Sequence, residues 1–386
     1  MRTPSGAGSP FRREPMRIVF FIHSLVSCWN HGNAHFLRGV LRELQARGHE
    51  TRVFEPEGAW SRENLVREQG EAAIARFHAA FPGLASETYG RDIDLDAMLD
   101  GADVVIVHEW NEPRLVSALG RKRAHGRFLL LFHDTHHRAV SAETDMSGLD
   151  LEHYDGVLAF GEVLRQLYLR RGWAERAFTW HEAADTALFR PIPEISPERD
   201  LVWIGNWGDG ERTAELSTFL FEPVARLGAS LDVYGVRYPP EGVAAVEAAG
   251  GVFRGWLPNT QVPRAFAAHR ATVHIPRRPY VEALPGIPTI RVFEALACGI
   301  PLVSAPWDDT EGLFRPGLDF LMARNGDDMA VRLGTVLRDA EARAALIRNG
   351  LETIRARHSC AHRVTELLSI VERLRTGRAL ASEAAE

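Results

Sequence analysis

The fold is decided by residues 17–54, which read RIVFFIHSLVSCWNHGNAHFLRGVLRELQARGHETRVF. The apolar run Arg17–Ile22 is long enough to form a buried strand. Apolar residues then recur at helical spacing from Phe36 to Leu44, and Gly48 stands where a glycine ends a helix. Thr51–Phe54 predicts a second strand. Strand, helix and strand in this order open a doubly wound α/β sheet.

The same pattern continues along the chain and restarts after a proline-rich break at residues 189–197. The expected strands are 103–107, 128–132, 156–160, 201–204, 230–234, 251–254, 271–275 and 302–304. Most are continuously apolar, which is typical of strands buried on both faces of a parallel sheet. We therefore expect two Rossmann-like domains at residues 16–188 and 189–360, followed by a C-terminal helix and tail at 361–386.

Length and composition agree with a two-domain globular protein. The chain has 386 residues, of which 45% are hydrophobic, and about 150 residues per domain is usual. A net charge of −6 disfavours a general nucleic-acid binder. The three cysteines form no C-x-x-C pair, and no apolar run reaches the ~18 residues of a membrane span. We expect a disordered tail at residues 1–15 and a cytoplasmic location.

Ligands of open α/β sheets bind beyond the carboxyl ends of the strands, so the loops there are informative. The loop from Gly205 through Asn206 to Arg212 follows a strand and opens a helix. Its glycines allow close approach of an anion, and Arg212 can add a bidentate phosphate contact. The spacing is not the dinucleotide fingerprint. An ordinary surface loop remains the alternative.

The run His133-Asp134-Thr135-His136-His137 suggests a metal site at first sight. Adjacent loop residues rarely all reach one ion, and no second cluster of matching spacing follows, so we expect no metal. Sugar contacts, acid/base chemistry or a plain polar strand end are the alternatives. The D-x-D patterns at residues 92–96 are explained by acids at a helix start.

A resemblance to a known family enters at residues 285–304, PGIPTIRVFEALACGIPLVS. The core Phe293–Gly299 with Pro301 resembles the signature of group 1 glycosyltransferases, and Arg291 ahead of it looks most like the CgeB-like (spore-maturation) branch. Residues 182–191, EAADTALFRP, are similar to the segment that leads such enzymes from the first domain into the second. The resemblance covers residues 16–375 and is only architectural in the first half.

The resemblance implies a GT-B fold, with two Rossmann-like domains facing a cleft, and transfer of a sugar from a nucleotide diphosphate sugar. In the signature itself, Gly286 and Pro288 make a turn, and a helix begins at Thr289. Its amides and Arg291 can face a diphosphate, and Glu294 can accept both ribose hydroxyls. The family implies a nucleobase at Trp256 and Leu257. It places the sugar and the acceptor at the loop of His23, Asn30, Gly32 and Asn33.

One departure concerns the E-x7-E pair of glutamates usual in retaining members. The second is Glu294, but Gly286 stands at the first position. For an inverting reaction the candidate bases are Asp134, Glu109 and His133, with Asp134 preferred because it closes a buried strand. The resemblance implies retention, and we expect no metal or other cofactor.

The acceptor is expected to be a small molecule, a glycan or a protein. A non-catalytic nucleotide-binding scaffold and a sugar-nucleotide epimerase are the alternatives to a transferase.

Overall fold

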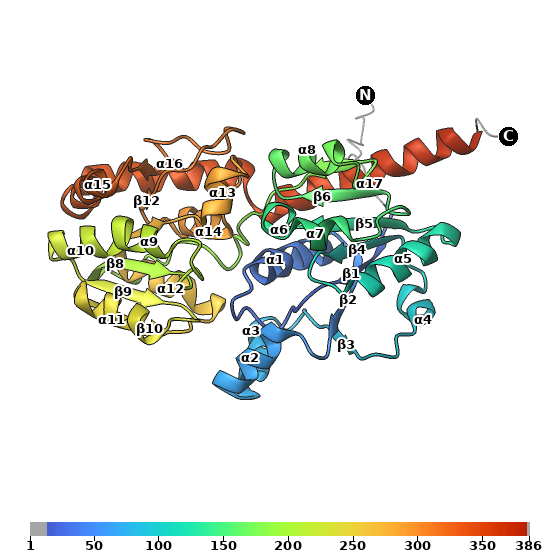
Figure 1. The fold of residues 1–386 in the computed structure, drawn as a ribbon, viewed down its shortest axis with the longest axis horizontal. Coiled ribbons are helices and arrows are strands. Elements are labelled where there is room, and N and C mark those ends of the chain that lie inside the picture. The colour runs from blue at the N-terminus through green and yellow to red at the C-terminus, as the bar shows by residue number, and fades with distance from the viewer. Residues whose placement is uncertain (1–13, 384–386) are drawn as a thin grey trace, which may run out of the picture.

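The computed structural model describes residues 14–383. The tail expected at residues 1–15 therefore lies, except for Glu14 and Pro15, outside the described residues. Two α/β domains lie side by side, each built around one parallel sheet (Figure 1). Within residues 14–383 the N-terminal sheet has seven strands in the order β3-β2-β1-β4-β5-β6-β7, and the C-terminal sheet has six in the order β10-β9-β8-β11-β12-β13.

The N-terminal sheet is parallel throughout its described pairs. Its strands are β1 (Arg17–Phe21), β2 (Glu50–Pro56), β3 (Glu87–Tyr89), β4 (Val104–His108), β5 (Leu129–Asp134), β6 (Gly156–Ala159) and β7 (Ala177–Thr179). Its helices are α1 (Asn33–Ala46), α2 (Trp60–Gln69), α3 (Ala72–Ala80), α4 (Leu95–Leu99), α5 (Pro113–His125), α6 (Arg138–Ser141), α7 (Glu143–Ser147) and α8 (Glu162–Arg170).

The C-terminal sheet is parallel in the same way. Its strands are β8 (Arg199–Ile204), β9 (Leu231–Tyr234), β10 (Gly251–Gly255), β11 (His269–His274), β12 (Leu302–Ser304) and β13 (Leu321–Met322). Its helices are α9 (Thr213–Leu216), η1 (Ser217–Phe221), α10 (Glu222–Leu227), α11 (Pro240–Ala248), η2 (Asn259–Gln261), α12 (Val262–Ala267), α13 (Arg278–Glu282), α14 (Ile290–Cys298), α15 (Gly326–Arg338) and α16 (Ala340–Arg357).

Burial on both faces explains why the central strands are continuously apolar. Every residue of β4 is buried. Ile106 contributes to the core on one face of the sheet and Val105 to the core on the other. Helices cover both faces, as the doubly wound fold requires. The predicted fold class is therefore confirmed.

Three short strands, β3, β7 and β13, were not predicted. They are edge strands of two or three residues and are only partly buried, so the sequence shows no apolar run there. Residues 61–99 form a polar stretch whose sequence is helix-prone but does not place its elements; it contains most of α2, all of α3, strand β3 and helix α4.

Between residues 14 and 383 the chain passes twice between the domains. The first passage leads from β7 to β8, and the second from α16 into α17 (Cys360–Glu383). Helix α17 runs back over the N-terminal domain (Figure 1), where Cys360, Val364 and Leu367 join the core beside helix α1. The passages are joined by hydrogen bonds from Ala184 N to His358 O (3.0 Å) and from Cys360 N to Ala184 O (2.9 Å). The two domains are thus linked along one edge.

Among the described residues, no helix is both long enough and apolar enough to cross a bilayer.

Candidate functional site

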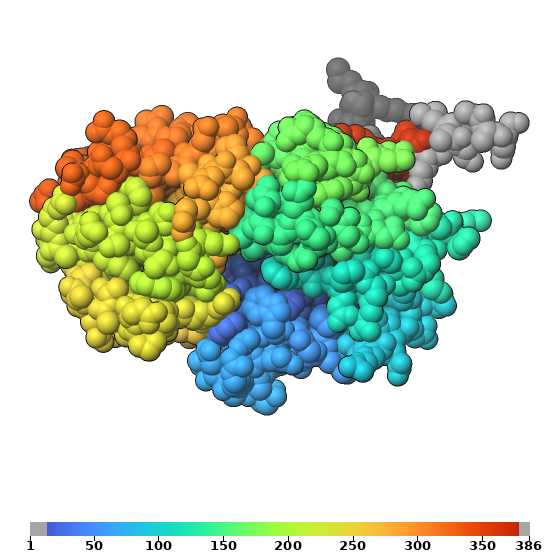
Figure 2. Space-filling view, in the orientation of Figure 1, coloured from blue at the N-terminus to red at the C-terminus, as the bar shows by residue number. Residues whose placement is uncertain are grey.

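The main cleft lies between the two domains and has a volume of about 990 Å³. The surface is visibly hollowed where the domains meet (Figure 2). Loops at the carboxyl ends of strands from both sheets line the cleft, as parallel α/β topology predicts. The predicted site residues that line it are Asn30, Gly32, Asn33, Gly205, Asn206, Arg212, Trp256, Leu257, Thr289 and Arg291.

Arg212 is held at the floor of the cleft by the loop that follows β8. Its Nη1 donates to the carbonyl of Ile275 (3.2 Å), and its Nη2 donates to Oδ1 of Asn206 (2.6 Å). Its Nε is buried and has no hydrogen-bond partner in the described part of the chain. A guanidinium with one unused buried donor, beside a cavity, is a ready site for an oxyanion.

A second arginine, Arg277, approaches the same point from the loop after β11. Its Nη2 donates to Oδ1 of Asn206 at 3.1 Å, so both guanidinium groups meet at one amide oxygen. Burial, together with the like charge of Arg277, lowers the pKa of Arg212 to about 10, and the nearby carboxylates of Asp209 and Glu211 offset only part of this effect. An anion bound between them would relieve this repulsion. Asn206 also reaches across the cleft, where its Nδ2 donates to Oδ1 of Asn30 (2.6 Å).

Helix α14 points its N-terminus at the cleft. Thr289 is the N-cap residue, in an extended conformation with φ −78° and ψ 158°, and it lines the cleft together with Ile290 and Arg291. Glu182 accepts a hydrogen bond from the Ile290 amide. Burial, reinforced by the negative charge of Glu294, raises the pKa of Glu182 to about 8. At neutral pH this carboxyl is therefore mostly protonated, and the helix terminus keeps its positive potential.

Glu294 is fully buried and does not line the cleft. Its Oε1 lies 2.6 Å from Nδ1 of His35, on helix α1 of the other domain, and its Oε2 pairs with Arg291. Burial raises the pKa of Glu294, but Arg291 and His35 outweigh burial and bring it below the ordinary value. The carboxylate predicted to accept ribose hydroxyls is thus occupied by an interdomain ion pair, and its ribose contact stays a prediction.

Gly286 also lies outside the residues that line the cleft. Its amide donates to Asp308 O (2.6 Å), and its φ of +89° lies in the left-handed region. A Cβ atom there would overlap the Thr310 hydroxyl and approach the Glu311 side chain. Both the backbone conformation and the space require glycine, so this turn has no room for the glutamate usual at the first position.

The predicted bases Asp134, Glu109 and His133 lie behind the wall of the cleft rather than in it. All three are buried, with exposed fractions of 0%, 1% and 0%. His133 and Asp134 belong to β5, which runs two residues beyond the predicted strand, so their side chains stay within the sheet layers. Burial raises the pKa of both Asp134 and Glu109. Asp134 accepts from the Tyr168 hydroxyl at 2.8 Å.

The N-terminal domain presents a different histidine to the cleft. His31 lies in the loop after β1, between Asn30 and Gly32, and donates a hydrogen bond to the Ser24 carbonyl. Its Nε2 has no partner among residues 14–383. Burial holds the pKa of His31 well below the ordinary value, so the ring is neutral. His23, predicted beside it, lines a separate cavity and contacts the Trp60 ring, with ring centroids 4.5 Å apart.

Several side chains that line the cleft were not among the predicted site residues. They are Trp60, Arg67 and Glu68 of α2, together with His31, His35, Glu182, Arg237 and Arg277. Arg237 and Arg277 lie in the loops at residues 236–238 and 276–278, which the rule that ligands bind at strand ends marks as informative, although neither arginine was given a role. Helix α2 gave no such signal, because it does not directly follow a strand end with polar residues; Trp60 and Leu65 of this helix belong to the apolar cluster that also contains Val236 of the other domain.

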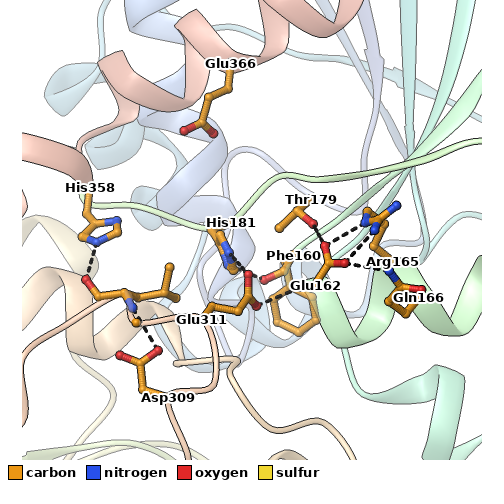
Figure 3. Close-up of polar contacts among 12 residues, drawn as sticks. Phe160, Glu162, Arg165, Gln166, Thr179, His181, Asp309, Glu311, His358 and Glu366 are labelled. Carbon is orange, nitrogen blue, oxygen red and sulfur yellow. Dashed lines mark hydrogen bonds and ion pairs between the residues drawn. The ribbon is translucent and has the colours of Figure 1, made fainter.

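A further contact between the domains is made by Glu311 (Figure 3). Its Oε1 accepts from the amide of Glu162 (2.8 Å) at the start of α8, and its Oε2 lies 2.9 Å from Nε2 of His181. Nδ1 of His181 lies 2.9 Å from the Phe160 carbonyl. These bonds fix the relative position of the domains near the passage between them. In residues 14–383, no group of three or more His, Cys, Asp or Glu side chains is arranged to hold a metal ion.

Comparison with known proteins identifies the fold. Residues 212–369 match the family model described as "Glycosyl transferase-like". No curated protein matches the chain in sequence. Among solved structures, Anabaena HepE in complex with UDP and glucose superimposes with a TM-score of 0.66 at 15% identity, over 93% of this chain and 100% of that chain. The chain has the GT-B fold.

Two other solved structures support this fold. Sucrose-phosphate synthase from Thermosynechococcus elongatus gives a TM-score of 0.64 at 16% identity, over 94% of this chain and 100% of that chain. An alpha-glucosyltransferase in complex with UDP and a 13-mer DNA gives 0.65 at 11% identity, over 93% of this chain and 100% of that chain. At these identities the GT-B likeness describes architecture, and the activity has to be argued from the cleft.

Proposed function

We propose that this GT-B protein is a glycosyltransferase that moves a sugar from a nucleotide diphosphate sugar to an acceptor. One observation carries the proposal: Arg212 and Arg277 converge in the interdomain cleft, and Nε of Arg212 is buried without a partner in the described chain. The family match over residues 212–369 supports it. So does the likeness to structures that hold UDP or UDP-glucose.

The diphosphate is proposed to bind between the two guanidinium groups and the N-terminus of α14. Arg212 and Arg277 would each exchange their bond to Asn206 Oδ1 for phosphate oxygens. The amides at Ile290 and Arg291 add partial positive charge. As the sugar leaves, negative charge builds on the diphosphate, and these fixed donors stabilise it without reorganisation. We propose that they supply the charge that a divalent metal supplies in other transferases.

The nucleoside is proposed to lie toward Trp256 and Leu257, which line the cleft beyond β10. Trp256 is partly buried against the cluster that joins the two domains, and its indole can stack on a base. For Glu294 to reach a ribose, its bond to His35 has to open. Ribose binding and separation of this pair are therefore coupled in the proposed mechanism.

We propose retention at the anomeric carbon, in keeping with the family resemblance. A retaining reaction requires no general base. The burial of Asp134 and Glu109 outside the cleft is therefore compatible with retention. An inverted product, detected by the anomeric proton coupling in NMR, would instead assign the base to His31. The residue lines the cleft, its Nε2 is buried without a partner in the described chain, and a neutral imidazole can take a proton from a hydroxyl.

The test combines binding and turnover. UDP, GDP and dTDP are titrated by calorimetry, each against its nucleoside as a control without phosphates, and the matching sugar nucleotides are followed by NMR for slow hydrolysis. Tight diphosphate binding with release of free sugar supports a transferase. Binding without turnover indicates a scaffold, and release of an altered sugar indicates an epimerase. Failure of every diphosphate to bind overturns the proposal. The CgeB-like branch and a cytoplasmic location stay predictions.

A further inference from the structure

A second cavity, of about 420 Å³, opens at the carboxyl edge of the N-terminal sheet. It lies over four adjacent strands, because its lining includes residues that end or follow β1, β2, β3 and β4. The starts of helices α2 and α5 complete its wall. Its volume falls within the range of about 300–1,000 Å³ that small-molecule sites occupy.

Two indoles separate this cavity from the main cleft. Trp60 and Trp110 line both spaces, and their ring centroids lie 6.1 Å apart at an interplanar angle of 77°. Arg138 lies over the Trp110 ring, 4.7 Å from its centroid, and fixes that side chain. A molecule held in the second cavity therefore touches the same wall that bounds the cleft. To meet a donor bound in the cleft, one end of such a molecule has to pass the wall that these indoles form.

The lining of the cavity combines aromatic faces with balanced charge. Tyr89 joins Trp60 and Trp110, and its hydroxyl donates to Oδ1 of Asn111 at 3.0 Å. The charged side chains are Glu57, Arg91, Glu112 and Arg114, all exposed residues. Glu112 and Arg114 pair with each other, Oε2 to Nε at 2.5 Å. The two carboxylates and two guanidinium groups together can accept and donate hydrogen bonds, and their charges sum to zero.

We propose that this second cavity binds a neutral saccharide, which is the acceptor of the transfer. The inference rests on the proposed function and extends it to the acceptor's chemical class. The C–H faces of a pyranose pack on indole and phenol rings, while its hydroxyls need both donors and acceptors around the edge. The cavity offers both kinds of contact.

Other acceptor classes fit the cavity less well. A nucleic acid requires a basic track for its phosphates, whereas the rim charges cancel and the whole chain carries −6. A lipid or other apolar acceptor would leave Glu57, Arg91 and the Arg114–Glu112 ion pair at its surface without a polar group of the acceptor to contact. An acidic glycan would gain no net attraction. Among these classes, the neutral saccharide is the one that can contact both the aromatic faces and the polar rim.

The test uses the full chain saturated with UDP and a printed array of neutral glycans, with single-stranded DNA and serine-rich peptides as comparison probes. Binding of a glycan, followed by transfer to it from the matching UDP-sugar, is the expected result. The bound glycan is then titrated against variants. Tyr89→Ala is expected to weaken glycan binding at least tenfold, and Tyr89→Phe, which keeps the ring, by less than threefold.

Two further variants guard against misfolding. Arg91→Ala removes an exposed rim group and is expected to weaken glycan binding several-fold with an unchanged unfolding temperature. Arg76→Ala, on the exposed side of α3, removes the same charge elsewhere and should change neither binding nor turnover. If UDP binds but no glycan does, or if DNA or peptide binds instead, the saccharide inference is overturned while the donor site stands. If UDP, GDP and dTDP all fail to bind, the proposed function fails first; if only UDP fails, the array is probed with the diphosphate that binds.

Discussion

His35 and Glu294 lie 259 residues apart in sequence, and Nδ1 of His35 is 2.6 Å from Oε1 of Glu294 across the domain boundary. Both side chains are buried, with exposed fractions of 6% and 0%. Burial lowers the pKa of His35, but Glu294 and Cys28 outweigh it and the pKa is raised. The pair is therefore an imidazolium and a carboxylate that hold the two halves of the molecule together.

Removing one partner of this pair should be costly. Glu294→Ala leaves a buried imidazolium without its carboxylate and is expected to lower the free energy of unfolding by about 3–5 kcal/mol. Glu294→Gln keeps an oxygen acceptor and should lose less. Urea unfolding at pH 6 measures both. Equal stability of wild type and Glu294→Ala would show that the ion pair does not hold the domains.

The same pair sets a pH window for stability. The pKa of Glu294 lies below its ordinary 4.5, so its contribution is complete above that value and is lost as pH falls through the lowered pKa. The pKa of His35 lies above its ordinary 6.5, so its contribution is complete below that value and is lost as pH rises through the raised pKa. The stability difference between wild type and Glu294→Gln should be largest between pH 4.5 and 6.5. A difference that does not vary with pH would exclude a charged pair.

Arg277→Ala is expected to weaken UDP binding by about 1.5–3 kcal/mol, the usual value for a hydrogen bond to a charged group. Uridine, which lacks the diphosphate, should bind wild type and variant equally. Calorimetry measures both ligands. Arg264→Ala removes the same charge from an exposed site in the same domain that does not line the cleft, and it serves as the control. If the variant lost affinity for uridine as well, Arg277 would not act through contact with the phosphates.

Glu182 should make nucleotide binding sensitive to alkaline pH. Its pKa is raised to about 8, so it is protonated at pH 7 and becomes negative as pH rises through 8. That charge lies at the helix terminus where the diphosphate is proposed to bind, and repulsion of about 1 kcal/mol or more is expected. Wild type and Glu182→Gln should bind UDP alike at pH 6.5, and wild type should bind at least about fivefold more weakly at pH 9. Comparison at each pH cancels the titration of UDP itself.

Cys28 should be the reactive thiol of the described chain. Burial raises its pKa, but the hydrogen bond to His35 and the charge of Arg38 outweigh burial and lower the pKa to about 6. Burial raises the pKa of both Cys298 and Cys360. Iodoacetamide at pH 7 should therefore label Cys28 first, and UDP should protect it because Cys28 lines the cleft. Peptide mass spectrometry locates the label, and labelling of Cys298 or Cys360 first would contradict the prediction.

Gly286 can be tested against a matched glycine. Gly286→Ala introduces both a left-handed alanine and an overlap with Thr310, whereas Gly312, at φ +62°, has no atom within 4 Å of a built Cβ. Gly312→Ala should cost about 1–2 kcal/mol from the backbone alone. Gly286→Ala should cost about 1–3 kcal/mol more from crowding. Urea unfolding of the two variants separates the backbone contribution from the crowding contribution. Equal losses of stability would show that the Thr310 side chain shifts to make room for the added methyl group.

The architecture could be predicted because its determinants are local. A strand buried on both faces, such as β4, must be apolar along its length, and that pattern is visible in one sequence. Edge strands such as β3 bury little and leave no pattern. The positions of the cleft loops also followed from the sequence, since parallel strands bring their carboxyl ends to one edge.

The inward or outward direction of each polar side chain could not be predicted in the same way. His133 and Asp134 were expected beyond a strand end, but β5 continues through them and buries them. Glu294 was expected to face a ligand, yet its partner His35 comes from the other domain. Such outcomes depend on how two domains meet, and a periodic pattern within one segment carries no information about that contact.

The two hydrogen-bonded passages at Ala184 and His358–Cys360 have a mechanical consequence. Because the two interdomain connections are hydrogen-bonded to each other, they define a hinge axis. The domains can rotate about this axis but cannot separate, as domains joined by one flexible linker can. Helix α2 lies on the side opposite α16 and α17 (Figure 1), away from this axis. Rotation about the axis therefore changes the distance between the domains where Trp60 and Trp256 pack near one another, and the fluorescence of these two residues would report the motion.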